Sequence, residues 1–360
     1  KDTASSVERQ QIAIGSEASQ EFNFSTSFEN LVLNPGDHVK YYFEVWDNDA
    51  VNGVKSSKSQ TFEIQIPSEE EIDNILRNAT SDISRSAETS MSDLKKLQEE
   101  INELMRRLVD KKELSWQDKK QLEELKKKHE EVKQNLDQMR KQMQENQRLE
   151  DKYRDQSEQL MEKQKELDRL FDQVMNDEIK EMMQEMDRLM NELDKQKVQE
   201  ELENIKLKNE DLEKQLDQNI ELMKRLDLEK RVEQAVQKAD NLAREQEELS
   251  NKQQEKNEAL EQQQQLSEQY RQLQKDIDQI KKDYKNLDNP SDFKTDKQLQ
   301  KNIENSQKDA EQKLQKGKQK DASKSQKQAA DDLKKLAEEL HRLRRTGHPQ
   351  RGLQRRHRKE

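Results

Sequence analysis

Residues 94–108 read LKKLQEEINELMRRL, and the spacing of their apolar side chains decides the fold class. Leucine or isoleucine recurs in steps of three, four, three and four, at Leu94, Leu97, Ile101, Leu104 and Leu108. Such steps average about 3.5 residues, which keeps one apolar stripe on the side of a helix that faces a partner helix. The stretch therefore predicts a coiled-coil helix.

Four later segments continue this spacing, starting at residues 122, 175, 198 and 266. With the first segment they supply the residues that we expect to form helix–helix seams: Leu94, Leu97, Ile101, Leu104, Leu122, Leu125, Val132, Leu136, Met182, Met186, Leu202, Leu212, Leu216, Leu273, Ile277 and Ile280. Polar residues hold two seam positions, His129 and Asn209. His129 has no second metal ligand nearby, so we interpret both as residues that set helix alignment at some cost in stability.

The composition agrees with narrow helical seams rather than one large round core. Charged residues make up 40% of the 360 residues, hydrophobic residues 29% and aromatic residues 4%. A compact globular domain is usually nearer to about half apolar. No glycine lies between Gly53 and Gly317, and no proline between Pro67 and Pro290. Disordered segments usually accumulate these residues and helix interiors exclude them, so the long middle region is predicted to be helical.

Several classes of function are disfavoured by what the sequence lacks. There is no cysteine, which excludes disulfides, thiolate nucleophiles and cysteine-ligated metals. The apolar runs are short, so neither a membrane span nor a signal peptide is expected. The net charge of −11 argues against a general nucleic-acid binder. Carboxylates on exposed helix faces keep ordinary pKa values, and no phosphate-binding loop is present. We therefore expect no enzyme and no cofactor.

Residues 1–67 alternate polar and apolar side chains in a manner typical of β-strands. The period of two is clearest in residues 39–46 and 61–66, and shorter runs repeat it at Ile12/Ile14, Phe22/Phe24 and Leu31/Leu33. Four or five such strands suggest an immunoglobulin-like sandwich, which normally needs about seven. We therefore expect an incomplete β-module, and we expect residues upstream of Lys1, including any membrane anchor.

The helical region is expected to fold as helical hairpins or as a partly folded-back bundle. Residues 68–288 form the main coiled-coil region, with a break near 109–116, and residues 289–340 form a helical segment after Pro290. Residues 244–265 are rich in Gln and Glu and nearly lack a seam, so they are either a solvated helix or a weak hinge. The pairing of the helices does not follow from the sequence.

Residues 341–360 differ from the rest of the chain. They hold seven Arg, one Lys and one acid, Glu360, for a net charge of +7, so that −18 remains on the body of the chain. Two interpretations stay open. The segment is a basic tail that touches nucleic acid or anionic lipid, or it is an artefactual end such as a shifted reading frame.

Two further features suggest binding sites. Asp47 and Asp49 lie in an acidic loop that lacks the remaining ligands of an EF-hand, which leaves a calcium site between strands as the alternative to a simple turn. A methionine-rich stretch includes Met161, Met175, Met182, Met183, Met186 and Met190. Flexible thioethers can form an adaptable binding surface, although filling a helix–helix seam is their default role.

Several segments together resemble one family of large, uncharacterised proteins from Bacteroidota-type bacteria. They are Gly36-Asp37 with YYFEVWDND at 41–49, Gly53 with SSKS at 56–59, LSWQ at 114–117, LFDQVM at 170–175, NEDLE at 209–213 through Leu226, NPSDFKTD at 289–296 and SQKQAA at 325–330. The resemblance covers roughly residues 20–340. It implies N-terminal transmembrane helices, β-sandwich modules and a long helical region on the periplasmic side of the cytoplasmic membrane, with this chain as an internal fragment. It supplies no catalytic residues.

The expected function is a structural or scaffolding part of a membrane-anchored envelope protein. Its seams would mediate self-association or recruit an envelope protein, and contact with a membrane would come only through the missing upstream segment. Two alternatives remain. One is a holdase-like module that binds unfolded clients through the Met-rich helices. The other is a sensory ectodomain whose β-module binds a ligand such as calcium.

Overall fold

The computed structural model describes most of the chain in two compact units, Lys1–Ile75 and Leu76–Glu360. The described residues are 9–13, 15, 21, 24–25, 31, 33–47, 53–111, 113–154, 157–174, 179–192, 194–252, 255–288, 290 and 293–346. Ile14, Phe22 and Asp49, and the chain beyond Thr346, lie outside them. The prediction of a mainly helical fold preceded by a small, incomplete β-module is confirmed.

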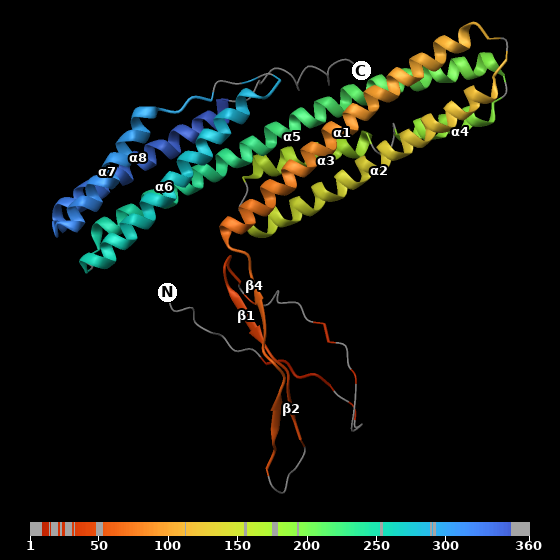
Figure 1. Cartoon of the computed structure of the whole chain (residues 1–360). Coiled ribbons are helices and arrows are strands. Elements are labelled where there is room, and N and C mark those ends of the chain that lie inside the picture. The colour runs from red at the N-terminus through yellow and green to blue at the C-terminus, as the bar shows by residue number, and fades with distance from the viewer. Residues whose placement is uncertain are drawn as a thin grey trace. The chain divides into compact units, whose positions relative to one another are not determined.

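The first unit holds four short strands in two antiparallel pairs. β1 (His38–Tyr41) pairs with β4 (Phe62–Gln65), and β2 (Glu44–Trp46) pairs with β3 (Ser56–Lys58). Between the pairs, the backbone N–H of Ser59 donates to the carbonyl of Phe43 at 2.9 Å. The described strands therefore follow one long hairpin (Figure 1), and among the described residues each sheet has only two strands.

The helices begin at residues that suit helix N-termini. Ser115 caps the second helix in a reciprocal capping box with Asp118, and Asp194 and Asp296 cap two others through their carboxylates. The bounds are α1 Glu69–Val109, α2 Trp116–Tyr153, α3 Glu158–Gln173, α4 Ile179–Asn191, α5 Lys195–Asn251, α6 Lys256–Lys285, α7 Lys297–Gln315 and α8 Gln319–Thr346.

The structure shows where several helices end. In the Gln/Glu-rich residues 244–265, α5 ends at Asn251 and α6 begins at Lys256, which agrees with the hinge interpretation; a solvated helix is the wrong interpretation, because Gln246 and Gln263 are buried. Gly317 ends α7 in a left-handed conformation (φ +72°), which glycine adopts at little cost. The last helix runs beyond Leu340 to Thr346, into the segment that we separated as a basic tail.

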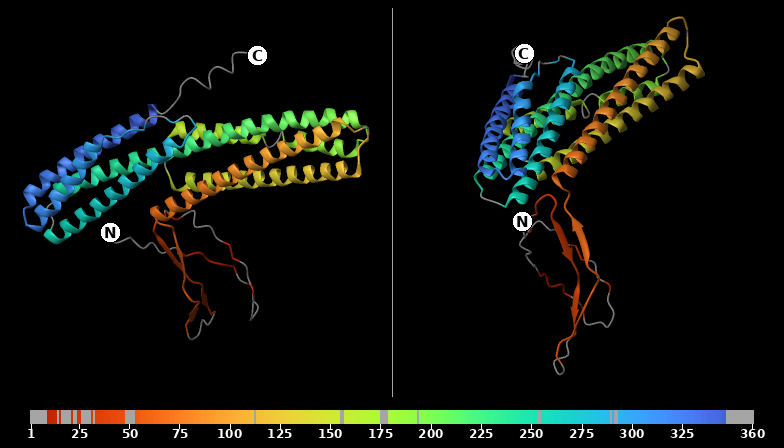
Figure 2. Two further views of the ribbon diagram at one scale, coloured as in Figure 1. Left: turned by 45° about the horizontal axis from the view of Figure 1, so that its top comes forward. Right: turned by 60° about the vertical axis from the view of Figure 1, so that its left-hand side comes forward.

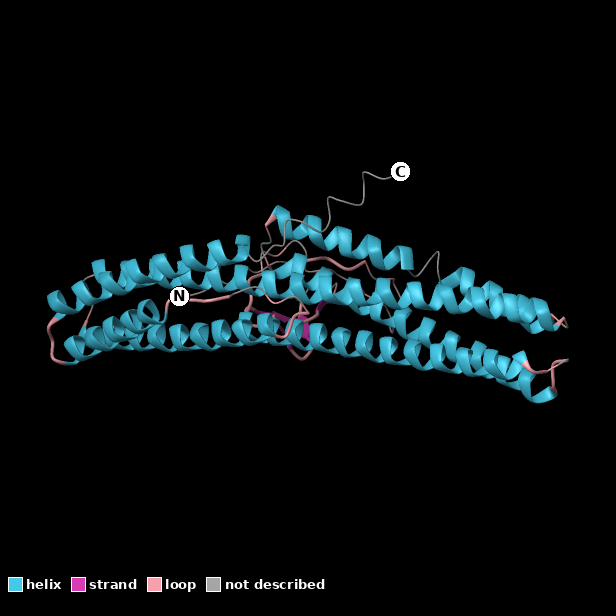
Figure 3. Cartoon of the chain, turned by 90° about the horizontal axis from the view of Figure 1, so that it is seen from above, coloured by secondary structure: helices cyan, strands magenta, loops and turns pink. Residues whose placement is uncertain are grey.

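Two apolar cores lie in the helical unit, and α5 belongs to both. The first core, here called the N-terminal bundle, contains residues of α1, α2, α3 and α4 and of α5 as far as Leu226. The second, the C-terminal bundle, contains residues of α5 from Leu228 onward and of α6, α7 and α8. Figures 1 and 2 show α5 in green passing from one group of helices into the other, and Figure 3 shows long helices running alongside one another.

The buried seam of α5 changes face between the two bundles. In the first half, buried residues follow steps of three and four through Leu216, Met223 and Leu226, and the next buried apolar residue is Leu228, only two positions on. Two residues correspond to a rotation of about 200° in an α-helix. The two bundles therefore pack against nearly opposite faces of one continuous helix.

The C-terminal bundle is packed around small side chains. The backbones of α5 and α8 approach each other closely at more positions than those of any other pair of helices in the described part of the chain. The buried residues of these two helices include Ala235, Ala239, Ala243, Ala322, Ala329, Ala330 and Ala337. Because the distance between two helix axes depends on the side chains at the contact, alanine lets these backbones approach closely. Within the described residues, no helix is both long and apolar enough to cross a membrane.

Candidate functional site

The sixteen predicted seam residues are buried within the chain itself. Each exposes 3% or less of its surface. Those from Leu94 to Leu216 belong to the core of the N-terminal bundle, and Leu273, Ile277 and Ile280 belong to that of the C-terminal bundle. Burying one such side chain stabilises a fold by about 1.5–3 kcal/mol. The seams are thus occupied by other helices of the same chain, and a partner would have to use other surfaces.

The two polar seam residues differ in what they bind. Asn209 on α5 donates from Nδ2 to the carbonyl of Leu94 at 3.1 Å and to Oε1 of Gln98 at 3.0 Å, both on α1. It therefore links two helices at one defined alignment. His129 bonds only within α2, where Nδ1 lies 3.0 Å from the carbonyl of Leu125. A carbonyl oxygen only accepts, so Nδ1 carries the proton, and the buried Nε2 has no hydrogen-bond partner. Burial lowers the pKa of His129.

The acidic loop closes on itself in the part that the structure describes. Oδ1 of Asp47 accepts from the backbone N–H of Lys55 at 2.8 Å, and the two backbones bond at 2.9 Å. This geometry fits the turn interpretation of Asp47. The other candidate calcium ligand, Asp49, lies outside the described residues. No group of three or more potential metal ligands occurs among the residues that the structure describes.

The methionine-rich stretch points mostly inward. Met182 and Met186 are fully buried, Met183 packs against the same core, and Met161 is exposed. Met175 and the side chain of Met190 lie outside the described residues. Among the described methionines of the stretch, Met182, Met183 and Met186 therefore contribute to a core, and Met161 leaves its thioether at the surface.

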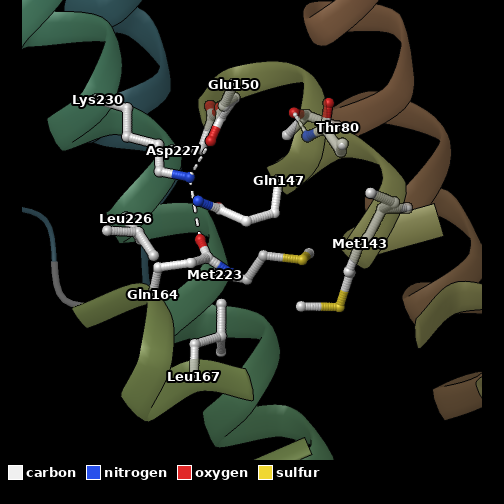
Figure 4. Close-up of a pocket in the computed structure, with 12 residues that line it drawn as sticks. Thr80, Met143, Gln147, Glu150, Gln164, Leu167, Met223, Leu226, Asp227 and Lys230 are labelled. Carbon is white, nitrogen blue, oxygen red and sulfur yellow. Dashed lines mark hydrogen bonds and ion pairs between the residues drawn. The ribbon is translucent and has the colours of Figure 1, made fainter. Parts of the chain in front are cut away.

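A buried polar site that the sequence did not predict lies where the two bundles meet on α5. A cavity of about 40 Å³ is lined by residues of α1, α2, α3 and α5, including Thr80, Asn146, Gln147, Gln164 and Asp227. Figure 4 shows the ammonium group of Lys230 between the side chains of Glu150 and Gln164. We call this region the joint.

An ion pair and an amide form the centre of the joint. The Nζ atom of Lys230 contacts the carboxylate of Glu150 and donates to Oε1 of Gln164 at 2.9 Å. The side chains of Lys230 and Glu150 expose only 11% and 7% of their surface. Both residues continue the heptad steps of their helices, four positions after Leu226 and seven after Met143. They therefore replace an apolar seam layer with charge, and this break in the apolar steps is the one signal in the sequence from which the joint could have been found.

Neighbouring residues of α5 extend the ion pairs to further helices. Lys163 on α3 pairs with Glu229 at 2.5 Å, Arg231 pairs with Asp283 on α6 at 2.7 Å, and Arg344 on α8 pairs with Glu233 at 2.5 Å. One short segment of α5, residues 229–233, is thus bound to α2, α3, α6 and α8. These contacts hold the ends of several helices against the middle of α5.

Two carboxyl groups at the joint have perturbed acidity. Burial raises the pKa of Asp227, and the charges of Arg231 and Lys230 oppose that increase. Burial also raises the pKa of Asp168, against a hydrogen bond from Gln164. Both groups therefore favour their protonated forms more than an exposed aspartate does.

The chemistry available at the joint is that of a small polar cavity. Two buried carbonyl oxygens on lining residues, Oδ1 of Asn146 and Oε1 of Gln147, have no hydrogen-bond partner. A volume of about 40 Å³ suits two or three water molecules, since each needs about 10–15 Å³. The cavity is far smaller than a typical ligand pocket, for which about 300 Å³ is a lower bound. The joint is thus suited to holding helices together rather than to binding a substrate.

Comparisons with protein-family models, with curated proteins and with solved structures find no match to this chain.

Proposed function

We propose that the chain is a structural or scaffolding part of a membrane-anchored bacterial envelope protein. The observation that carries the scaffolding role is α5, a helix of 57 residues that belongs to both cores. A continuous helix clamped on nearly opposite faces by two bundles resists bending more than two bundles joined by a loop. The envelope location rests on the sequence resemblance alone.

In this proposal the coiled-coil contacts join helices of one chain, and partners bind elsewhere. Large exposed apolar side chains outside the cores include Trp46 on β2, and Val109 and Trp116 at the ends of α1 and α2. A second copy or an envelope protein would contact surfaces of this kind. No enzymatic step is part of the proposal.

The scaffold is tested by placing charge in the seam of α5. Leu212→Asp together with Leu216→Asp buries two carboxylates that have no counter-charge at these seam positions, so we expect the N-terminal bundle to unfold. Circular dichroism should show a loss of helix, and X-ray scattering a more expanded chain. The matched control is Lys214→Asp with Gln218→Asp, two exposed positions of the same helix with the same spacing. Unchanged helicity and an unchanged scattering curve for the seam variant would refute the scaffold.

Solution mass and scattering of the unaltered chain test the same proposal without mutation. We expect the mass of one chain, because the seams are occupied internally, and a scattering curve that fits the helical unit described above. An obligate oligomer in which the seams pair between copies would contradict this.

The two alternative functions have less support. A holdase would need its methionines at the surface, and Met182 and Met186 are buried. A calcium-dependent sensor would need ligands beyond Asp47, whose Oδ1 accepts from the backbone of Lys55. Suppression of client aggregation, or calcium uptake in calorimetry, would favour these alternatives.

A further inference from the structure

Four glutamine side chains meet inside the C-terminal bundle, one from each helix. They are Gln246 on α5, Gln263 on α6, Gln307 on α7 and Gln326 on α8. Their exposed fractions are 0%, 0%, 2% and 3%, as low as those of the leucines in the same core. We call them the glutamine layer. Amides this deeply buried are costly unless they bind one another.

The four amides form one connected network. Gln246 and Gln263 bond reciprocally, with Nε2 to Oε1 distances of 2.8 and 3.1 Å. Gln326 donates to Oε1 of Gln263 at 3.1 Å, and Gln307 donates to Oε1 of Gln246 at 3.5 Å. Each carbonyl of the reciprocal pair therefore accepts two N–H groups. The network joins the hairpin α5–α6 to the hairpin α7–α8.

The network requires a single alignment of the helices, whereas the apolar seam around it does not. Seven residues from each glutamine along its own helix lie Ala239, Tyr270, Leu314 and Leu333. All four are buried in the apolar core of the C-terminal bundle. A slip of one helix by seven residues would keep apolar side chains on the seam. It would also place one of these residues opposite the remaining glutamines, whose amides would lose partners in a dry interior.

We propose that the glutamine layer determines the pairing and register of the C-terminal bundle. It selects the register in which the α7–α8 hairpin pairs with α5–α6, and it excludes shifted pairings, including shifted pairings with a second copy of the chain. A polar residue at a seam position is known to specify alignment and oligomeric state in coiled coils. This inference concerns specificity and goes beyond the scaffolding role.

The first test removes the polarity of the whole layer. Replacing all four residues with leucine should raise the melting temperature, because well-packed apolar groups of similar volume often stabilise more than a buried polar network. The same variant should lose its single mass in light scattering and form dimers and larger species as its concentration rises. A monomer at every concentration would overturn the proposal.

A second measurement reports register directly, and it applies even if the quadruple variant aggregates. The chain has no cysteine, so Glu247→Cys with Lys334→Cys introduces one specific pair where an ion pair of 2.7 Å now joins α5 to α8. A short thiol cross-linker should join the two within one chain. A one-heptad slip moves them about 10 Å apart along the axis.

The cysteine pair is then combined with Gln307→Leu and Gln326→Leu, which alter one hairpin only. We expect the cross-link within the chain to fall at least several-fold and cross-links between chains to appear. The control is Gln312→Leu with Gln328→Leu, exposed residues of the same two helices. Equal cross-linking within the chain for both pairs of substitutions would overturn the assigned role.

Discussion

The two bundles share α5 and the same heptad spacing, yet they have different interiors. All eleven methionines of the chain lie between Met91 and Met223, in the part of the sequence that forms the N-terminal bundle. The C-terminal bundle instead buries several alanines of α5 and α8. Long, flexible side chains fill irregular space between helices that stand apart, whereas alanine fits only where backbones lie close. The same heptad spacing is therefore compatible with closely packed helices in one bundle and more widely spaced helices in the other.

The polar residues inside the bundles differ as well. The N-terminal bundle contains a buried histidine, His129, and the buried ion pair Lys230–Glu150 lies at its end. The glutamine layer of the C-terminal bundle carries no charge at any pH. We therefore expect the first bundle to respond to charge removal and to acid, and the second to respond mainly to changes of size and register.

The largest effect is expected from breaking the ion pair at the joint. Lys230→Met removes the ammonium group that neutralises Glu150 in a buried site, which should lower the free energy of unfolding by about 3–5 kcal/mol. Urea denaturation followed by circular dichroism measures this. Adding Glu150→Leu to Lys230→Met should restore most of the loss.

A half-exposed pair provides the control for that comparison. Lys334→Met removes the partner of Glu247 at the surface of the C-terminal bundle, where such a pair contributes about 0–1 kcal/mol. If both lysine variants lost the same stability, burial would not be the property that distinguishes the joint.

Changes of side-chain size should destabilise the C-terminal bundle more than the N-terminal bundle. Ala239→Leu inserts a large side chain into the core of the C-terminal bundle, and we expect a loss of about 1–3 kcal/mol from overpacking. Met186→Leu in the N-terminal bundle keeps the volume and should cost less than about 1.5 kcal/mol. Urea midpoints of the two variants check the order, and a larger loss for Met186→Leu would show that the packing contrast is wrong.

Acid should weaken the N-terminal bundle through His129. Because burial lowers the pKa of His129 in the folded state, the unfolded chain binds a proton first as the pH falls below about 6.5. Stability is thus complete above that pH and declines below it, by about 1 kcal/mol over the first pH unit. Hydrogen exchange measured at pH 7.5 and at pH 5.5 should show that the lower pH increases local opening in α2 more than in α6. His129→Leu should remove the difference.

The smallest effect is expected from Asp227. Its pKa is raised by burial, so the ionised form is penalised at neutral pH and the penalty disappears once the group is protonated in both states. Asp227→Asn should therefore stabilise the chain at pH 7 by less than about 1 kcal/mol, because the side chain keeps 29% of its surface exposed. At about pH 3 the variant and the parent chain should unfold at similar urea concentrations; a gain that persists there would point to another cause.

Much of the local structure followed from the sequence. The break near residues 109–116 and the apolar stripes were both readable, because each depends on residues within one or two helical turns. The joint was not predicted, since Lys230, Glu150 and Gln164 come from three helices far apart in the sequence. Each of these residues looks like an ordinary solvated side chain until its partners are placed beside it.

The sequence by itself determined that this chain forms helices with narrow apolar seams after a small β-module, because periodicity and the absence of glycine and proline act locally. Only the tertiary structure decided which seams meet, that α5 presents nearly opposite faces to two bundles, and that Gln246 and Gln263 lie inside rather than outside. A heptad pattern predicts that an apolar stripe packs against another helix, but it does not identify that helix. The partner helix is determined by loop lengths, side-chain volume and the pairing of buried polar groups across helices.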